Sequence, residues 1–265
     1  MSVTPRTRPG LAVGVGIGLL AGALSGLFGV GGGILIVPGL VLLTGMGQRR
    51  AHATSLAAIL PIAIAGAAGY GLEGAIDWIA VGLLTAGGIV GSFLGTHALR
   101  RIPERSLRIL FALFLLVAAA LLPFEATAGA GAAIDLVRGI ALVLVGALAG
   151  ALAGLLGVGG GIVMVPGLVL LASLSPAVAK GTSLVAIIPT SLVGTLRNVE
   201  RNDVDLPTSA TIGAGGVVAS FAASLLSVRL DPELSAILFG ALLVVMAVRL
   251  LLAARGKPIP GEHPD

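Results

Sequence analysis

Apolar segments of about 20 residues, separated by short polar or glycine-rich segments, follow one another along nearly the whole chain. A helix of that length crosses roughly 30 Å of hydrocarbon, so the pattern predicts membrane-spanning helices. The predicted helices cover residues 11–28, 34–47, 52–70, 76–98, 106–122, 138–156, 162–174, 178–196, 206–227 and 234–253.

Two of these helices, 34–47 and 162–174, are too short for a comfortable span, and each contains a proline, Pro38 or Pro166. Each also follows a GVGGG segment. A proline in the first turns of a helix removes few hydrogen bonds. We therefore expect a half-helix joined to the preceding helix through a glycine break. The sequence leaves open whether these hairpins are re-entrant or fully spanning.

The chain contains an internal repeat, because residues 26–43 and 154–171 are identical at 15 of 18 positions. The first segment is GLFGVGGGILIVPGLVLL and the second is GLLGVGGGIVMVPGLVLL. The register continues without a gap to the TSL tripeptides at 54–56 and 182–184. This similarity indicates a duplication of the chain.

The repeat divides the chain into a first membrane repeat, a linker, a second membrane repeat and a short tail. The apolar run from Leu11 resembles the core of a signal peptide, but it continues into a motif that recurs in mid-chain, so we expect a retained helix. The four parts are residues 1–123, 124–135, 136–255 and 256–265.

Composition agrees with a protein that lipid surrounds. The 265 residues are 57% hydrophobic and 11% charged, with a mean hydropathy of +1.10. A soluble domain has about a quarter charged residues, so this chain cannot cover its own surface with polar groups. Its 41 glycines suit a membrane bundle, where small residues let helices approach closely. The chain has no cysteine, which excludes disulfides, cysteine-zinc sites and thiol catalysis.

The chain is basic, with a pI near 10.6, yet this does not indicate a nucleic-acid-binding protein. The Lys and Arg residues lie singly or in small groups between apolar segments, and one Trp and one Tyr offer little base stacking. We interpret the positive charge as a topology signal.

The positive charges predict the orientation of the helices. Suppose that the N-terminus is cytoplasmic and that each broken hairpin returns to its own side. Most of the 16 Lys and Arg residues then face the cytoplasm, as the positive-inside rule requires. The cytoplasmic set is Arg6, Arg8, Arg49, Arg50, Arg100, Arg101, Arg105, Arg108, Arg197, Arg201, Arg249, Arg255 and Lys257, and the outer set is Arg138, Lys180 and Arg229.

Each half then crosses the membrane an odd number of times, so the second half starts on the opposite side and both termini are cytoplasmic. The predicted fold class is an all-α polytopic membrane protein of two inverted-topology repeats. Each repeat has a glycine-broken helical hairpin and three spanning helices, which gives about 8 transmembrane segments, or about 10 with the half-helices.

The GVGGG segments are candidates for an anion site. Consecutive glycines in an apolar run leave backbone amides without partners, and in a bilayer protein, water or ligand must satisfy them. A helix that starts after such a break directs N–H groups and a positive dipole end at one point. The alternative is close packing of helices through small residues. The residues concerned are Gly31, Gly32, Gly33, Gly159, Gly160 and Gly161.

Two hydroxyl pairs, Thr54-Ser55 and Thr182-Ser183, complete the candidate substrate site. They lie near the starts of equivalent helices and can donate hydrogen bonds to an anion, but they can equally cap those helices or bond to their own helix. Just before them, His52 and Lys180 occupy equivalent positions, where we expect them at the membrane interface. The alternative for either residue is a role in binding substrate or protons.

The charged segment RNVERNDVD, residues 197–205, begins with Arg197 and predicts a solvated loop. We find no HExxH, GxSxG or paired carboxylates in a span. We therefore expect no catalytic residue, no metal and no cofactor.

The duplicated pattern GxxGxGGGxxxxP, at residues 26–38 and 154–166, resembles that of the sulfite exporter TauE/SafE family of probable membrane transporters. The resemblance covers roughly residues 11–253. It implies a permease for small sulfur oxyanions or organosulfonates, such as sulfite or sulfoacetate, with an ion-coupled secondary mechanism. It also implies location in a bacterial or archaeal cell membrane.

We interpret the sequence as that of a secondary transporter, not an enzyme, that moves such an anion across the cytoplasmic membrane by alternating access. The expected partners are a small anionic substrate, the lipid bilayer and, as a candidate coupling ion, the proton. The alternatives are an anion channel and a structural membrane protein whose glycines only pack helices. Substrate identity, direction of transport and oligomeric state stay open.

Reporter fusions test the orientation. We expect a cytoplasmic signal from fusions at residue 265 and within residues 100–108, and an outer signal from a fusion within residues 124–135, because an inverted second half must begin outside. The same side for the linker and the C-terminus would contradict the inverted repeat.

Overall fold

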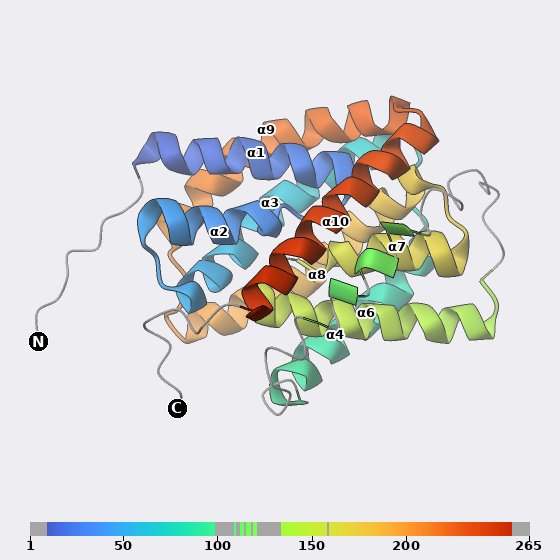
Figure 1. Ribbon diagram of the computed structural model, residues 1–265, viewed down its shortest axis with the longest axis horizontal. Coiled ribbons are helices and arrows are strands. Elements are labelled where there is room, and N and C mark those ends of the chain that lie inside the picture. Colours follow the sequence, from blue (N-terminus) through green and yellow to red (C-terminus); the bar gives the residue numbers. More distant parts are fainter. Residues whose placement is uncertain are drawn as a thin grey trace, which may run out of the picture.

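A computed structural model gives the fold, and it describes residues 10–98, 109, 112–113, 115–117, 119–120, 134–157 and 159–255. Every regular element in these residues is a helix (Figure 1). The helices are α1 (Leu11–Phe28), α2 (Gly33–Thr44), α3 (Gln48–Leu72), α4 (Trp78–Ala98), α6 (Leu136–Leu156), α7 (Gly161–Ala172), α8 (Pro176–Glu200), α9 (Leu206–Arg229) and α10 (Pro232–Arg255).

The structure confirms an all-helical polytopic membrane protein. Five helices, namely α1, α3, α6, α8 and α9, are long and apolar enough to cross a membrane. Large apolar side chains such as Leu20, Trp78 and Val218 are more than 60% exposed on the outside of the bundle, where lipid can cover them. Of the predicted helix 106–122, the structure describes residues 109, 112–113, 115–117 and 119–120, which are all helical. Most of the linker 124–135 and the tail 256–265 lie outside the described residues.

The short helices α2 and α7 have 12 residues each and equivalent bounds in the two repeats. At 1.5 Å per residue, each is about 18 Å long, well short of the hydrocarbon thickness. Both are therefore half-helices, as predicted. The solvated loop predicted for residues 197–205 is shorter than expected. Helix α8 continues to Glu200 and holds Arg197 in its last turn, and residues 201–205 form the connection to α9.

Contacts between α3 and α8 show that the repeats are inverted. The N-terminal part of α3 meets the start of α9, where the backbone N–H of Asp205 donates to Thr54 Oγ1. The N-terminal part of α8 meets the start of α4, where the N–H of Asp77 donates to Thr182 Oγ1. Because α9 directly follows α8 in the chain and α4 directly follows α3, α3 begins beside the end of α8 and α8 begins beside the end of α3. The two equivalent helices therefore run antiparallel through the centre.

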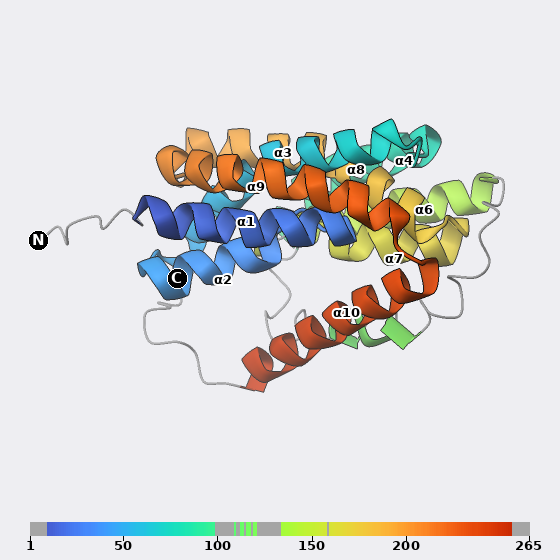
Figure 2. The same cartoon turned by 90° about the horizontal axis from the view of Figure 1, so that it is seen from above.

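The two halves interlock through two helix pairs, α1 with α9 and α4 with α6, which lie side by side in Figures 1 and 2. Each pair joins one helix from each half and has glycines along its contact. A Cβ atom at Gly22 would lie 2.2 Å from the Gly216 carbonyl oxygen, and one at Gly150 would lie 2.1 Å from that of Gly88. These contacts exclude any side chain, so the glycines set the distance between the halves.

Helix α10 crosses the bundle obliquely, and the described pieces of residues 109–120 lie beside it in Figure 2. A Cβ atom at Gly240 would lie 3.4 Å from the Ala119 carbonyl oxygen. The N-terminal part of α10 also contacts α1. The ring of Phe239 stacks on that of Phe28 at the end of α1, with 5.7 Å between centroids.

A glycine-to-alanine pair tests the interlock. Gly22→Ala should lower the melting temperature and the yield of monodisperse protein, because overpacking typically costs about 1–3 kcal/mol. Gly16→Ala, on the same helix, is the control, since a Cβ atom there would meet nothing within 4 Å. Thermal unfolding of purified protein measures both. Equal melting temperatures for the two variants would show that the α1–α9 contact is looser than described.

Candidate functional site

Each helical hairpin is broken by glycines in left-handed backbone conformation. Helix α1 ends at Phe28, and Gly29, Gly31 and Gly32 have φ angles of +70°, +81° and +76° before α2 begins at Gly33. Only glycine adopts these angles without strain. The second half repeats this geometry, with φ angles of +64°, +88° and +78° at Gly157, Gly159 and Gly160.

The two breaks meet each other inside the protein. A Cβ atom at Gly161 would lie 2.5 Å from the Gly29 carbonyl oxygen, so the backbones of the two breaks touch. Hypothetical Cβ atoms at Gly31 and Gly159 would both approach Ile59, at 3.3 Å in each case. The N-termini of α2 and α7 therefore converge on one buried region. Neither helix has a side-chain cap, and the first-turn N–H groups of a helix have no partner within it.

Each break is held by a serine from the other half. The Ser55 hydroxyl donates to the Gly157 carbonyl oxygen at 2.9 Å, and the Ser183 hydroxyl donates to the Gly29 carbonyl oxygen at 3.0 Å. The two bonds are equivalent under the repeat. Gly29 and Gly157 end α1 and α6, where carbonyls lose their helical partners. Both serines are fully buried, so these carbonyls are satisfied without water.

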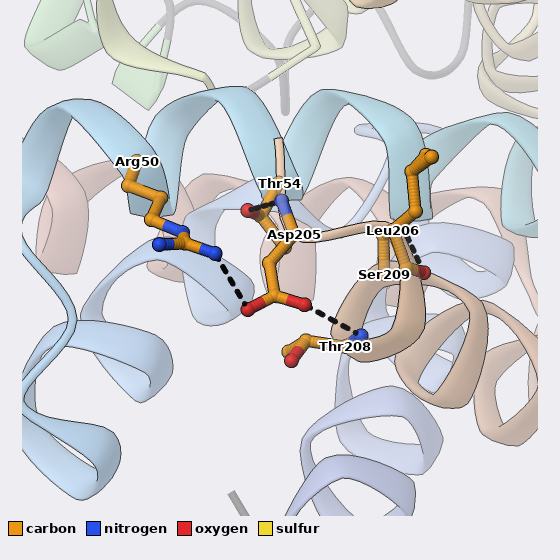
Figure 3. A network of polar contacts seen from close by, with 6 residues as sticks. All are labelled: Arg50, Thr54, Asp205, Leu206, Thr208 and Ser209. Carbon is orange, nitrogen blue, oxygen red and sulfur yellow. Dashed lines mark hydrogen bonds and ion pairs between the residues drawn. The ribbon is translucent and has the colours of Figure 1, made fainter. Parts of the chain in front are cut away.

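The threonines also join the halves. Figure 3 shows the Asp205 N–H directed at Thr54, while the Asp205 carboxylate accepts from the N–H of Thr208 and so caps α9. Asp77 has the same role at the start of α4, and its N–H donates to Thr182. The interpretation of the hydroxyl pairs as caps of their own helices is therefore wrong, because their partners belong to the opposite repeat.

Two ion pairs break the symmetry on one face. Arg49 pairs with Asp203 at 2.9 Å, and Arg50 pairs with Asp205 at 3.1 Å (Figure 3). The positions equivalent to the two arginines are Ala177 and Val178, so the opposite face cannot form them. A cavity of about 350 Å³ beside Arg50 is lined by Arg50, Val199, Asn202, Val204 and Leu206.

The structure brings the predicted glycines together between the two halves and places the hydroxyl pairs next to them. The glycines at 31–33 and 159–161 are buried and share one region between the halves. The serine of each hydroxyl pair contacts the break of the opposite repeat, whereas the threonine accepts from the N–H of Asp205 or Asp77. Sequence reasoning missed Ile59 and Ile187, which pack between the breaks, because nothing distinguishes them from other apolar residues of the spans.

Lys180 corrects another prediction, since its side chain does not extend to the protein surface as a snorkelling lysine would. Its side chain is 1% exposed, and its ammonium group donates to Ser227 and Ser235. The sequence did contain a signal, because Lys180 lies between apolar residues close to Thr182-Ser183. The equivalent His52 is half-buried.

Comparisons with known proteins agree with this architecture. The sequence model of the sulfite exporter TauE/SafE family matches residues 2–122 and 142–264. A probable membrane transporter protein of Xylella fastidiosa (strain 9a5c) is 28% identical over 251 residues, covering 92% of this chain and 96% of that relative. The probable membrane transporter protein YunE of Bacillus subtilis (strain 168) is 32% identical over 131 residues, covering 47% and 48%.

The resemblance predicted from the duplicated motif is confirmed, since the family match covers nearly the whole chain in two segments. It also confirms the expectation of a transporter rather than an enzyme. The chain belongs to the sulfite exporter TauE/SafE family and is a multi-pass membrane transporter.

Proposed function

We propose that this chain is a secondary transporter that moves a small sulfur-containing oxyanion, such as sulfite, sulfoacetate or another organosulfonate, by alternating access of its two inverted halves. The observation that carries the proposal is the convergence of two glycine breaks, one from each half, with the uncapped N-termini of α2 and α7. The family description supports the substrate class.

A sulfonate or sulfite group suits such a region chemically. Its negative charge is spread over several oxygens, which can accept hydrogen bonds from several N–H groups at once. Two helix N-termini supply these donors together with the positive ends of two dipoles. The backbone donors can therefore bind the anion without a basic side chain in direct contact with it.

Binding at this position requires the two halves to move. In the described conformation the breaks touch, and Ile59 and Ile187 fill the space next to Gly31. An anion enters when the breaks separate on one face. The ion pairs of Arg49 and Arg50 hold one face together, and the opposite face has no equivalent pair. In the proposed mechanism, the faces therefore open alternately, and this conformation is closed at the ion-paired face.

The distribution of charge gives the proposed orientation. The ion-paired face carries Arg49, Arg50 and Arg201, which the positive-inside rule places in the cytoplasm. We assign the protein to the cytoplasmic membrane of a bacterium or archaeon, with both termini inside and with the proton as the coupling ion to test first.

Alanine variants of two glycines test the anion site. In Gly31→Ala and Gly159→Ala, the added methyl group blocks the approach of an anion to the backbone. The positive φ angle adds strain of about 1–2 kcal/mol. We expect a roughly tenfold or greater rise in the apparent KM for sulfite or sulfoacetate uptake by proteoliposomes. Gly45→Ala is the matched control, because Gly45 has a φ angle of +65° and lies at the far end of α2.

Three outcomes would count against the proposal. Wild-type affinity in well-folded Gly31→Ala and Gly159→Ala protein would leave the glycines as packing residues. Saturable flux that never rises against a gradient, with or without a proton gradient, would indicate a channel. An absence of uptake of sulfite, sulfate, sulfoacetate, taurine and thiosulfate by the wild type would refute the substrate class.

The two serines give a symmetry test. Ser55→Ala and Ser183→Ala each leave one buried carbonyl without its donor, which costs about 1–3 kcal/mol. Because the bonds are equivalent, we expect similar falls in melting temperature and in transport rate for both variants. Ser209→Ala is the control, since Ser209 donates to Leu206 in its own helix. If both serine variants behave like that control, the serines do not hold the breaks.

A further inference from the structure

Lys180 is a buried basic residue that takes no part in the symmetric hydrogen bonds between the two repeats. It lies in the first part of α8, and its side chain is almost completely enclosed. The ammonium group donates to Ser227 Oγ at 3.1 Å and to Ser235 Oγ, and it lies 5.8 Å from the centroid of the Phe28 ring. These partners come from the end of α9, the start of α10 and the end of α1.

No carboxylate balances this charge in the part of the chain that the structure describes, where both recorded ion pairs belong to arginines. The acidic residues nearest along the chain to Ser235, Asp231 and Glu233, are exposed, and Asp231 accepts from N–H groups of α10. A buried charge normally has a partner of opposite sign. The C-terminal ends of α1 and α9 offer only partial negative charge.

The Lys180 site adjoins one of the central breaks. A Cβ atom at Gly29 would lie 2.6 Å from the Lys180 Cα atom, so the backbones of α8 and the break are in direct contact. Ser183, less than one turn further along α8, donates to the same glycine. The ammonium group therefore stands beside the first break, on the face that lacks the arginine ion pairs.

The hydrogen bonds around Lys180 leave donors available for a ligand. An ammonium group has three N–H donors, and two of them serve the serine oxygens. Ser227 donates its own proton to the Leu27 carbonyl oxygen. No acceptor is recorded for the Ser235 hydroxyl proton among the described residues, and Ser235 is buried in the first turn of α10.

From this arrangement we infer that Lys180 and Ser235 form a second anion subsite on the transport route, at the α8–α9–α10 corner next to the first glycine break. The subsite takes the sulfonate or sulfite group as it passes between this face and the central breaks. The inference rests on the proposed function. Movement of the α10 N-terminus exposes the ammonium group, and the anion becomes the counter-charge that the protein lacks.

Two substrates of different charge separate this role from a structural one. Sulfoacetate carries two negative charges, whereas taurine has the same sulfonate group and no net charge. Lys180→Gln should weaken sulfoacetate binding by roughly ten- to a hundredfold, the range for a lost charge-assisted hydrogen bond. It should weaken taurine binding less, because the ammonium group of taurine repels Lys180 and offsets the attraction of its sulfonate. Isothermal titration of the purified full-length protein in detergent measures both. Lys180→Arg keeps the charge and should retain most of the sulfoacetate affinity.

Arg229→Gln is the matched control, because it removes the same charge from an exposed position two residues after Ser227. Its sulfoacetate affinity should stay within about twofold of wild type, since exposed charges are screened. If Lys180→Gln does not fold, Ser235→Ala keeps the test open, with an expected loss of about two- to tenfold for sulfoacetate.

The outcomes distinguish failure of the Lys180 subsite from failure of the proposed transport function. If the wild type binds sulfoacetate and Lys180→Gln binds it equally well, the Lys180 subsite is overturned and the proposed transporter stays intact. The same holds for Ser235→Ala if only that variant folds. Equal losses for sulfoacetate and taurine would also overturn it, because a packing defect does not distinguish the net charge of the ligand. If the wild type binds none of the sulfur anions tested, the proposed substrate class and this subsite both fail.

Discussion

The need to satisfy backbone groups where helices break inside an apolar protein is the constraint on which this structure depends. Helices α1 and α6 end in the interior, so the carbonyls of Gly29 and Gly157 have no helical partner and no access to water. The solution is reciprocal, since each half supplies the serine that the other half's break requires. The two halves are therefore mutually dependent, and neither break is complete in its own repeat.

The glycine-lined pairs α1–α9 and α4–α6 make this reciprocity geometrically possible. Their backbones approach so closely that a methyl group has no room at Gly22 or Gly150. Close approach brings α3 and α8 across the centre, where their serines reach the opposite breaks. Glycine thus has two separate roles, close packing along the spans and positive φ angles in the breaks, and only the second bears on the proposed anion site.

The symmetric frame carries asymmetric charges. Arginine ion pairs join the halves on one face, whereas the other face has a buried lysine beside the equivalent break. The direction of secondary transport is set by the gradients of the substrate and the coupling ion, so these differences do not determine it. The positions that differ between the repeats, Arg50 against Val178 and Lys180 against His52, are instead the places where the stability of the two faces and the coupling can differ in the proposed mechanism.

The sequence by itself determined the membrane character, the duplication, the half-helices and the inverted topology, because these follow from hydropathy, internal identity and the count of positive charges. The family also followed, since its motif occurs twice. The tertiary structure alone decided the partners of the polar residues. Ser55 and Gly157 are 102 positions apart, and no local sequence pattern shows which helices contact each other in the bundle. For the same reason the sequence predicted an exposed Lys180 side chain, whereas packing of α1, α9 and α10 around it encloses the ammonium group.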